Sequence, residues 1–503
     1  MNHTLRPAAV ALMLLLPAWG NAQNDKQDDF RKSFAEFRRE IQEEYNNFLG
    51  EINKEYVDFL KEAWKDMPGH KPLPEPKPIK EDPVVPIVAP EPAPRPQPLP
   101  DGNRIPVKVQ PTPKPEPAPA PPAPIREVPQ PVVRYVKVHY FGIEASLRCD
   151  ASQLPRLGGV SEQEVSRLWQ TLCDGRTNNL LSDCLRTRTD HDLCDWAYVQ
   201  LLREVAAACY PAASLVNERT AMHMFLLAQS GFRVRMGRTD GRLYTLLATD
   251  SRLFKYSYWT IDNREYYLID NEASVNRLYI SSATLPGEQA ARMVNAQHNL
   301  FGSHTGTRRT LQSKRYPEVQ ATIETNQNLI DFFNRYPRSY AAVDYKTVWR
   351  YYALTPLSEP VRRSLYPALQ KAIDGKGTLE KVEVLLNFVQ TAFVYGYDDS
   401  IWGGDRPFFA EETLHYPYSD CEDRAILFSR LVRDLVQLDV ALIYHPGHLY
   451  AAVRFPSSVS VGGDYIVVDG ARYTIADPTY IGARVGMTMP KMDNSKATAI
   501  LVR

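Results

Sequence analysis

The stretch that decides how the C-terminal part of the chain folds is Tyr418-Ser419-Asp420-Cys421-Glu422-Asp423-Arg424-Ala425. Apolar residues follow it at spacings of three and four, which predicts a helix with one buried face; they are Ala425, Phe428, Leu431, Val432 and Leu435. Cys421 then lies in the first turn, with Ser419 or Asp420 as the N-cap. The free amides and the positive dipole end of the helix favour a thiolate at this position.

Two hairpins are predicted after this helix. Residues 440–444 and 448–453 read as strands around the turn His445-Pro446-Gly447, and residues 465–468 and 472–476 as strands around Asp469-Gly470. The first hairpin places His448 at the start of a strand, and the second ends on Asp477. We therefore expect Cys421, His448 and Asp477 to come together.

Two other residues compete for these roles. His445 is a second candidate base, but its place in a turn before proline predicts a solvent-exposed loop histidine. Asp469 is a second candidate carboxylate, but an Asp-Gly pair is typical of a hairpin turn. The predicted trio therefore keeps His448 and Asp477.

The order of three separated motifs resembles the transglutaminase-like, papain-related superfamily of cysteine peptidases. The motifs are Cys421 leading a helix, Gly447-His448 opening a strand and Asp477-Pro478-Thr479 closing another, and Glu412-Thr413-Leu414 also agrees. The resemblance covers residues 375–485. It implies an α+β fold with a papain-type domain at the C-terminus.

The chain departs from the family pattern at two places. Asp420 stands before the cysteine, where many members have glycine, and the aromatic residue after the histidine, Tyr450, comes two positions later. These departures leave the three reacting residues in place. They affect what is expected of substrate specificity.

The resemblance implies a catalytic triad. Cys421 would be the nucleophile, His448 the base and acid, and Asp477 the group that orients the imidazole. The Cys421 amide would be one oxyanion donor, and the preceding segment would supply another; its candidates are Tyr395, Tyr397 and Trp402. The alternative is that Cys421 is a small core residue, which its charged neighbours argue against. No metal or other cofactor is implied.

Three functions remain open at this point. The favoured one is an exported cysteine peptidase or amidase that transfers the acyl group of a protein or peptide amide to water. A protein-glutamine transglutaminase, with an amine as acceptor, would use the same triad. A non-catalytic envelope scaffold is the third. The 59 Lys and Arg residues balance the 59 Asp and Glu residues, so no charge excess favours nucleic acid.

The first 67 residues are predicted to contain an export signal and a helix that contacts another protein surface. Residues 1–22 combine Arg6, an apolar run and small residues near the end, as a secretory signal peptide does. Residues 23–67 predict a long amphipathic, coiled-coil-like helix, available for self-association or for contact with an envelope protein. We expect a periplasmic or extracellular protein of a bacterial envelope, with no transmembrane helix in the mature chain.

A proline-rich linker is predicted over residues 68–133, which hold many of the 40 prolines of the chain. Such a composition favours an extended polyproline II spacer over a packed core. An α+β domain is predicted over residues 134–309, with a strand at 134–141 and a capping box at Ser161 that begins a helix through Leu172.

Five of the six cysteines fall in this region, namely Cys149, Cys173, Cys184, Cys194 and Cys209. In an exported protein such a cluster predicts disulfides, with at least one of the five left unpaired if Cys421 is free. The pattern Cys-x-x-Cys is absent, which disfavours zinc.

This region also echoes the C-terminal one. Asn217-Glu218-Arg219-Thr220-Ala221 aligns with Cys421-Glu422-Asp423-Arg424-Ala425, Arg242-Leu243-Tyr244 with His448-Leu449-Tyr450, and residues 267–270 with 466–469. We predict a degenerate copy of the transglutaminase-like fold, with Asn217 and Arg242 at the nucleophile and base positions. An unrelated α+β domain is the alternative.

The transglutaminase-like catalytic domain is predicted over residues 310–503, beginning with a helical bridge. Its expected helices are 319–333, 360–373 and 379–395. The polar, glycine-containing segment 398–405 is predicted to be a loop that either lines the substrate site or simply connects two elements.

Overall fold

The computed structural model describes residues 50–74, 99–111, 134–270, 275–340, 345–397, 402, 406–490, 492 and 494–502. The chain divides into two compact units, Met1–Glu51 and Ile52–Arg503. The predicted signal peptide, residues 23–49 of the predicted helix and most of the predicted linker lie outside the described residues. What is described is a mixed α+β fold, as expected, and the predicted domain boundaries stay predictions.

The earlier half of the second unit is built on an antiparallel six-stranded sheet with the order β1-β11-β6-β7-β10-β9. Its strands are β1 (Lys65–Pro68), β6 (Val234–Arg238), β7 (Leu243–Ala248), β9 (Tyr258–Ile261), β10 (Arg264–Leu268) and β11 (Arg277–Ile280). β7 is buried along its whole length, as expected for a strand covered on both faces.

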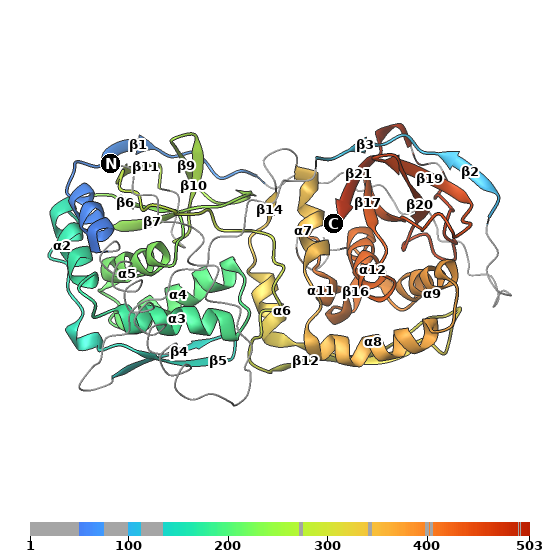
Figure 1. Cartoon of the computed structure of the whole chain (residues 1–503), viewed down its shortest axis with the longest axis horizontal. Helices are drawn as coiled ribbons and strands as arrows, with labels where there is room; N and C mark the ends of the chain where they lie inside the picture. Colours follow the sequence, from blue (N-terminus) through green and yellow to red (C-terminus); the bar gives the residue numbers. More distant parts are fainter. Residues whose placement is uncertain are drawn as a thin grey trace, which may run out of the picture. The chain divides into compact units, whose positions relative to one another are not determined.

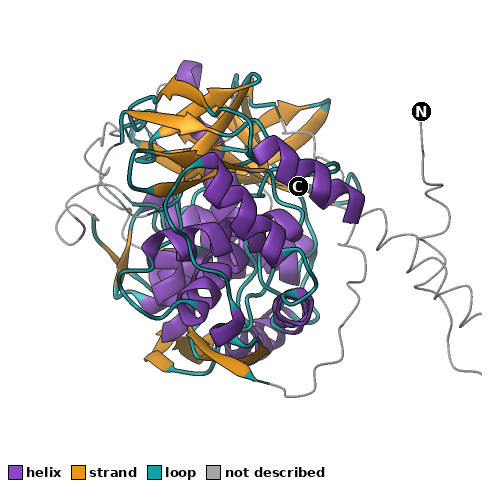
Figure 2. Cartoon of the chain, turned by 90° about the vertical axis from the view of Figure 1, so that its left-hand side faces the viewer, coloured by secondary structure: helices purple, strands orange, loops and turns teal. Residues whose placement is uncertain are grey.

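Helices lie between this sheet and a small hairpin (Figures 1 and 2). The helices are α2 (Glu162–Leu172), α3 (Asn178–Asp190), α4 (Asp195–Cys209) and α5 (Val216–Gln229), and the hairpin is β4 (Tyr135–Tyr140) with β5 (Ile143–Arg148). α5 packs on β6 and β7, and α4 packs on both α5 and β4. The predicted first strand and the predicted Ser161 cap are confirmed.

The later half is built on a seven-stranded sheet with the order β2-β19-β20-β18-β17-β21-β3. Its strands are β2 (Asp101–Arg104), β3 (Lys108–Val109), β17 (Val440–His445), β18 (His448–Val453), β19 (Gly463–Val468), β20 (Ala471–Ala476) and β21 (Thr498–Val502). Both predicted hairpins are confirmed. Asp469 and Gly470 form the tight turn between β19 and β20, both with positive φ.

The remaining elements surround this sheet or connect the halves. α12 (Cys421–Leu435) packs on β17 and β18 and against α9 (Thr378–Thr391). The others are β8 (Arg252–Leu253), β12 (Thr305–Gln312), β13 (Gln320–Asn326), α6 (Gln327–Asn334), β14 (Ser339–Tyr340), α7 (Val348–Leu354), α8 (Glu359–Ile373), β15 (Val394–Tyr395), α11 (Ala410–His415) and β16 (Tyr418–Ser419). The predicted helix 360–373 is confirmed as α8.

One predicted helix is partly wrong. Residues 319–333 were expected to be helical throughout, but β13 occupies the first part and only α6 is helical. In β13 alternate residues are buried, Ala321, Ile323 and Thr325, which is the period of a strand. The predicted helix 379–395 likewise ends earlier, at Thr391, and β15 follows.

The two sheets have the same core topology. In chain order β6, β7, β9, β10 and β11 correspond to β17, β18, β19, β20 and β21, and the spatial orders β11-β6-β7-β10-β9 and β21-β17-β18-β20-β19 are identical. Every pairing within these two sets is antiparallel. This shared order is what the predicted internal duplication requires; the duplication itself stays a prediction.

Residues 65–73, from the end of the predicted helix and the start of the predicted linker, and residues 101–109 of the linker pair with strands of the two sheets, so these residues are not part of an extended spacer. β1 pairs with β11, and His70 just beyond it bridges Tyr258 of β9. In the other sheet β2 pairs with β19, and β3 pairs with β21 (Figure 1). We call residues 65–73 and 101–109 the two edge straps. Each covers strand edges that would otherwise expose unpaired backbone groups.

The predicted N-terminal helix ends at Leu60, not at residue 67, and its described part packs on the chain itself. Tyr56 and Leu60 are buried, and the Tyr56 ring lies 4.8 Å from that of Trp169 in α2. Ser166 Oγ donates a hydrogen bond to the carbonyl of Val57 over 2.8 Å. For this part of the helix, the apolar partner is therefore the chain's own core.

Candidate active site

Cys421 begins α12, as the sequence predicts. Asp420 is the N-cap, and a capping box joins it to Asp423: each side chain accepts a hydrogen bond from the other's backbone amide. Asp423 Oδ1 also accepts from the Phe408 amide over 2.8 Å, which ties the helix start to the segment before α11. Ser419 is the last residue of β16 and not the cap.

His448 and Asp477 form a hydrogen-bonded pair. His448 opens β18, and its Nε2 lies 2.9 Å from Asp477 Oδ2 just beyond the end of β20. Burial raises the pKa of Asp477, but the charge of His448 and the hydrogen bonds from His448 and Thr479 outweigh it and hold the pKa below its usual value. Because an ionised carboxylate only accepts, Nε2 donates this hydrogen bond, and in the neutral form of the ring Nδ1 is the nitrogen with a free lone pair.

The loop after β20 holds Asp477 rigidly. Its Oδ1 accepts from the Thr479 amide over 2.9 Å, from Thr479 Oγ1 over 2.7 Å and from the Tyr480 amide over 3.2 Å. The buried side-chain amide of Gln390, in α9, donates to the carbonyls of Asp477, Tyr480 and Ala483. This loop therefore cannot turn the carboxylate away from His448 without breaking several bonds.

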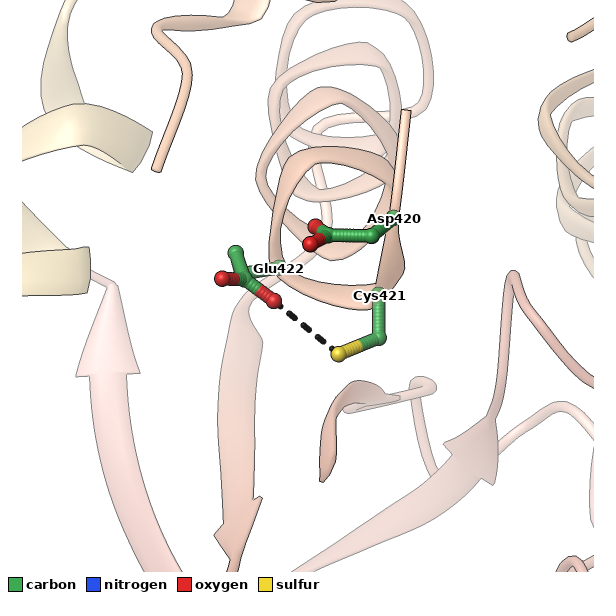
Figure 3. Close-up of side chains that lie close together, drawn as sticks. All are labelled: Asp420, Cys421 and Glu422. Atoms are coloured by element: carbon green, nitrogen blue, oxygen red, sulfur yellow. Dashed lines mark hydrogen bonds between the residues drawn. The ribbon is translucent and has the colours of Figure 1, made fainter. Parts of the chain in front are cut away.

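The thiol of Cys421 lies between polar neighbours. Sγ donates to Glu422 Oε2 over 3.0 Å (Figure 3) and accepts from the backbone amide of Leu449, the residue after His448. Burial raises the pKa of Cys421 well above its ordinary value; the charges of Glu422 and Asp420 raise it further, and the Leu449 amide lowers it. The predicted thiolate is thus not the form that this arrangement favours.

His448 at the start of β18 and Asp477 after the end of β20 lie at the same end of two interior strands of the seven-stranded sheet, and Cys421 is bonded to β18 through the Leu449 amide. The Leu449 amide holds Cys421 Sγ at the first residues of β18. The imidazole of the preceding residue, His448, is fixed by Asp477. Cys421 is 8% exposed, and the His448 side chain is 11% exposed. With Nε2 bonded to Asp477, Nδ1 is the ring nitrogen left for the thiol proton.

The aromatic ring of Tyr450 supports both histidines of the hairpin. It stacks on His448 at 5.4 Å and on His445 at 5.4 Å. His448 and Tyr450 are two apart on β18 and share a face, and His445 of β17 is paired with His448 across the hairpin. The expectation that His445 is solvent-exposed is wrong: it ends β17, is 1% exposed and has Nε2 2.9 Å from the Tyr450 hydroxyl. The aromatic residue that departs from the family spacing therefore packs on the imidazole.

Sequence reasoning missed three residues that support this site. From the sequence alone, Glu422 counts only as a charged neighbour of Cys421, although its adjacent position in the sequence already places it close to the thiol. Gln390 and Arg424 are polar residues inside apolar helix faces, which was the available signal. Arg424 of α12 is fully buried and donates to the carbonyls of Gln390 and Phe393 and to Ser419 Oγ, which links α12 to α9, to the residue before β15 and to β16.

The three oxyanion or substrate-lining candidates differ in their surroundings. Tyr395 lies in β15, which pairs in parallel with β16 just before Cys421, and burial together with the Cys421 charge raises its pKa. Tyr397 packs edge-on against Tyr395 at 5.7 Å. Trp402 contacts Arg406 and Tyr416, and no described interaction joins it to the trio. The rest of the predicted loop 398–405 lies outside the described residues.

Asp420, Cys421 and Glu422 also form a cluster of possible metal ligands. One ligand atom from each lies within 4.8 Å of the others, and no further His, Cys, Asp or Glu among the described residues joins them. Structural zinc sites use four ligands. The cluster alone is therefore an incomplete zinc site, and the Cys421 thiol is already bonded to Glu422 (Figure 3).

The equivalent positions of the six-stranded sheet have no nucleophile. Asn217 lies in the first turn of α5, and its Oδ1 accepts from the Leu243 amide over 2.9 Å, as Sγ accepts from Leu449. Asn217 Nδ2 donates to the Gly241 carbonyl over 3.0 Å. The asparagine therefore fastens the helix to the β6–β7 turn and holds no reactive group.

The strand register corrects one detail of the predicted alignment. Ala476 of β20 pairs with Ala451 of β18, and the Ile269 amide after β10 donates to Thr245 of β7. These pairings make Asp270 equivalent to Asp477, not to Asp469 as the sequence alignment had it. Arg242 takes the place of His448, and its Nη1 lies 3.3 Å from Asn217 Oδ1.

No protein-family model matches the chain, and no curated protein or solved structure is detectably similar to it. Among the described residues, no helix has both the length and the apolar character needed to cross a membrane. The geometry of the site therefore carries the functional argument.

Proposed function

We propose that the chain is an exported, transglutaminase-like cysteine hydrolase that cleaves amide bonds in protein or peptide substrates. The observation that carries this proposal is the hydrogen bond from His448 Nε2 to Asp477. His448 is next in the chain to Leu449, whose amide donates to Cys421 Sγ. In a neutral imidazole held this way, Nδ1 is the nitrogen that can take the thiol proton. A cysteine, a histidine and an orienting carboxylate are the parts of a nucleophilic acyl-transfer site.

The reaction begins when the thiol turns from Glu422 to His448. Nδ1 takes the thiol proton, and Sγ attacks the carbonyl carbon of the substrate. The resulting oxyanion accepts a hydrogen bond from the Cys421 amide at the helix start. The imidazolium then protonates the leaving amine, which departs and leaves a thioester on Cys421. Nδ1 next removes a proton from water, the hydroxide attacks the thioester, and the protonated thiol is restored as the acid leaves.

Transamidation would differ only in the second step, where an amine replaces water. A scaffold that does no chemistry would need neither an unprotonated Nδ1 nor a buried carboxylate to orient the ring. The site geometry supports acyl transfer over the scaffold, and the choice of acceptor is left to experiment.

The test follows peptide mixtures by mass spectrometry with the wild type and with Cys421→Ala, His448→Ala and Cys173→Ala. We expect hydrolysed peptides with the wild type and with Cys173→Ala, and none with the other two. Iodoacetamide labelling of Cys421 should also slow in His448→Ala. A primary amine added to the reaction would appear in the product of a transglutaminase. Equal labelling of Cys421 in the wild type and His448→Ala would contradict the proposal.

A further inference from the structure

Two of the five clustered cysteines touch in the core. Cys149 directly follows β5, Cys209 ends α4, and their Sγ atoms lie 3.9 Å apart. All six cysteines are described, and no other pair of their sulfurs comes within hydrogen-bonding distance. Cys149 and Cys209 are 2% and 0% exposed.

We propose that Cys149 and Cys209 form a disulfide in the exported protein. The thiolate of one attacks the disulfide of a protein thiol oxidoreductase, giving a mixed disulfide and one released thiol. The thiolate of the other cysteine then attacks this mixed disulfide, forms the Cys149–Cys209 bond and releases the second thiol. Two thiols are oxidised, one disulfide is reduced, and each cysteine of the chain loses one proton.

The surroundings hold both residues in place for this bond. The Cys149 amide donates to the Arg134 carbonyl over 2.9 Å, and the preceding Arg148 forms an ion pair with Asp183 over 2.7 Å. α4 packs directly on β4, the strand paired with β5. A disulfide needs sulfurs about 2 Å apart, so rotation of the two side chains must close a gap of less than that distance.

The chemistry of the surroundings favours a disulfide over a metal. Among the described residues, no histidine or carboxylate joins these sulfurs in a group that could hold an ion. An exported chain meets oxidising conditions while it folds, before the pair is buried. The bond would fasten the β4–β5 hairpin to the helix layer.

The proposal rests on the predicted export but not on the chemistry of Cys421. Cys421 lies far along the sequence and has its own partners, Glu422 and Leu449. A chain with no hydrolase activity could still carry the bond, and an active enzyme could lack it. Failure of this proposal and failure of the proposed function are therefore distinguishable.

Peptide mapping tests the proposal directly because trypsin separates the five cysteines. Cleavage after Arg and Lys gives residues 149–156 with Cys149 and residues 204–219 with Cys209, while Cys184 falls in residues 177–186. The full-length protein is exported in a bacterial host, unfolded in denaturant with iodoacetamide and no reductant, digested and analysed by mass spectrometry. The same sample treated with reductant before alkylation is the control.

We expect peptide 149–156 linked to peptide 204–219, with complete loss of alkylation at both cysteines and its return in the reduced control. Cys149→Ser should make Cys209 alkylatable, and Cys209→Ser should do the same for Cys149. Free, alkylated thiols at both positions of the exported wild type would overturn the proposal. So would a link from either peptide to peptide 177–186. Since wild-type mapping alone decides between these outcomes, a variant that fails to fold does not weaken the test.

Discussion

Cys421 shows how burial, together with neighbouring charges, can outweigh a helix N-terminus. The dipole end of a helix stabilises an anion by about 0.3–1 kcal/mol at an exposed position. Taking a charge out of water costs several kcal/mol, and Cys421 is both buried and bonded to Glu422. The position of Cys421 predicts a thiolate when the helix dipole is considered alone. With burial and two adjacent carboxylates included, the thiol is favoured.

Glu422→Gln should make Cys421 more reactive. The substitution removes the negative charge that raises the pKa of Cys421, after burial the largest cause. The iodoacetamide labelling rate, measured over a pH series, should then rise at a lower pH than in the wild type. Glu318→Gln, at an exposed position on a turn, is the matched control and should leave the profile unchanged. An unaltered profile in Glu422→Gln would contradict a contribution of the Glu422 charge to the raised pKa of Cys421.

Glu411 should make folding less favourable as the pH rises. Burial raises the pKa of this α11 carboxyl from 4.5 to about 7, although it accepts hydrogen bonds from the Ser358 amide and hydroxyl. The folded state therefore holds a proton that the unfolded state has released. Its contribution is complete below pH 4.5 and is lost as the pH rises through about 7. The loss is on the order of 3 kcal/mol.

Urea unfolding at several pH values measures this effect. Glu411→Gln stays uncharged, so the fall in the free energy of unfolding over this pH range should shrink in the variant. Glu318→Gln again serves as the control. Equal slopes in Glu411→Gln and the wild type would assign the pH dependence to another group.

At the scale of elements, sequence patterns predicted hairpins between neighbouring strands and missed strands whose partners are distant in the sequence. The hairpins around Gly447 and Asp469-Gly470 carry strong turn signals and alternate correctly. β13 was mistaken for a helix although alternate residues are buried, because its apolar residues merge with those of α6. β1 and β2 have partners hundreds of positions away, so nothing near them in the sequence marks them as strands.

In the site, too, residues marked by local patterns were predicted and residues that act through long-range contacts were missed. Cys421, His448 and Asp477 stand at element ends, where the pattern of a known family could be compared with them. Gln390 acts through its contacts with a loop that is distant in sequence. Such a contact exists only once α9 and the loop are placed side by side.

The short helix over residues 50–60 offers a matched pair of substitutions. Leu60 is fully buried, whereas its neighbour Phe59 is 44% exposed. Leu60→Ala should lower the free energy of unfolding by about 2–5 kcal/mol through the cavity it leaves. Phe59→Ala should change it by less than about 0.5 kcal/mol. Similar values for the two variants, from urea unfolding, would contradict the packing of this helix on the core.

At the scale of the whole described molecule, the edge straps join the N-terminal region to both sheets. The Asn103 amide donates to Asp464 Oδ1 over 2.8 Å, and the Ile105 amide donates to the Tyr465 carbonyl over 2.7 Å. The strap 101–109 pairs with both β19 and β21, the two strands that would be the edges of the sheet without it. A proline-rich composition therefore does not exclude strand pairing where short runs between prolines supply the amides.

Gly102→Val should detach the strap 101–109 from β19. A Cβ at this position would lie 2.3 Å from the backbone carbon of Gly463, and the backbone there has no flexible end that could move aside. We expect faster hydrogen exchange in residues 101–109, measured by mass spectrometry. Gly159→Val is the control, because a Cβ there would meet nothing within 4 Å. Unchanged exchange in Gly102→Val would contradict the close approach of the two backbones.

The straps also set an order for folding. A chain is synthesised from its N-terminus, yet Asn103 bonds to a residue 361 positions later, and β3 must wait for β21, which residues 498–502 form. Contacts between such distant residues form slowly because a long loop has to close first. The strap 101–109 therefore docks completely only after residues 463–502 have emerged. Loss of the last few residues at the C-terminus would leave a segment near the other end of the protein without its partner.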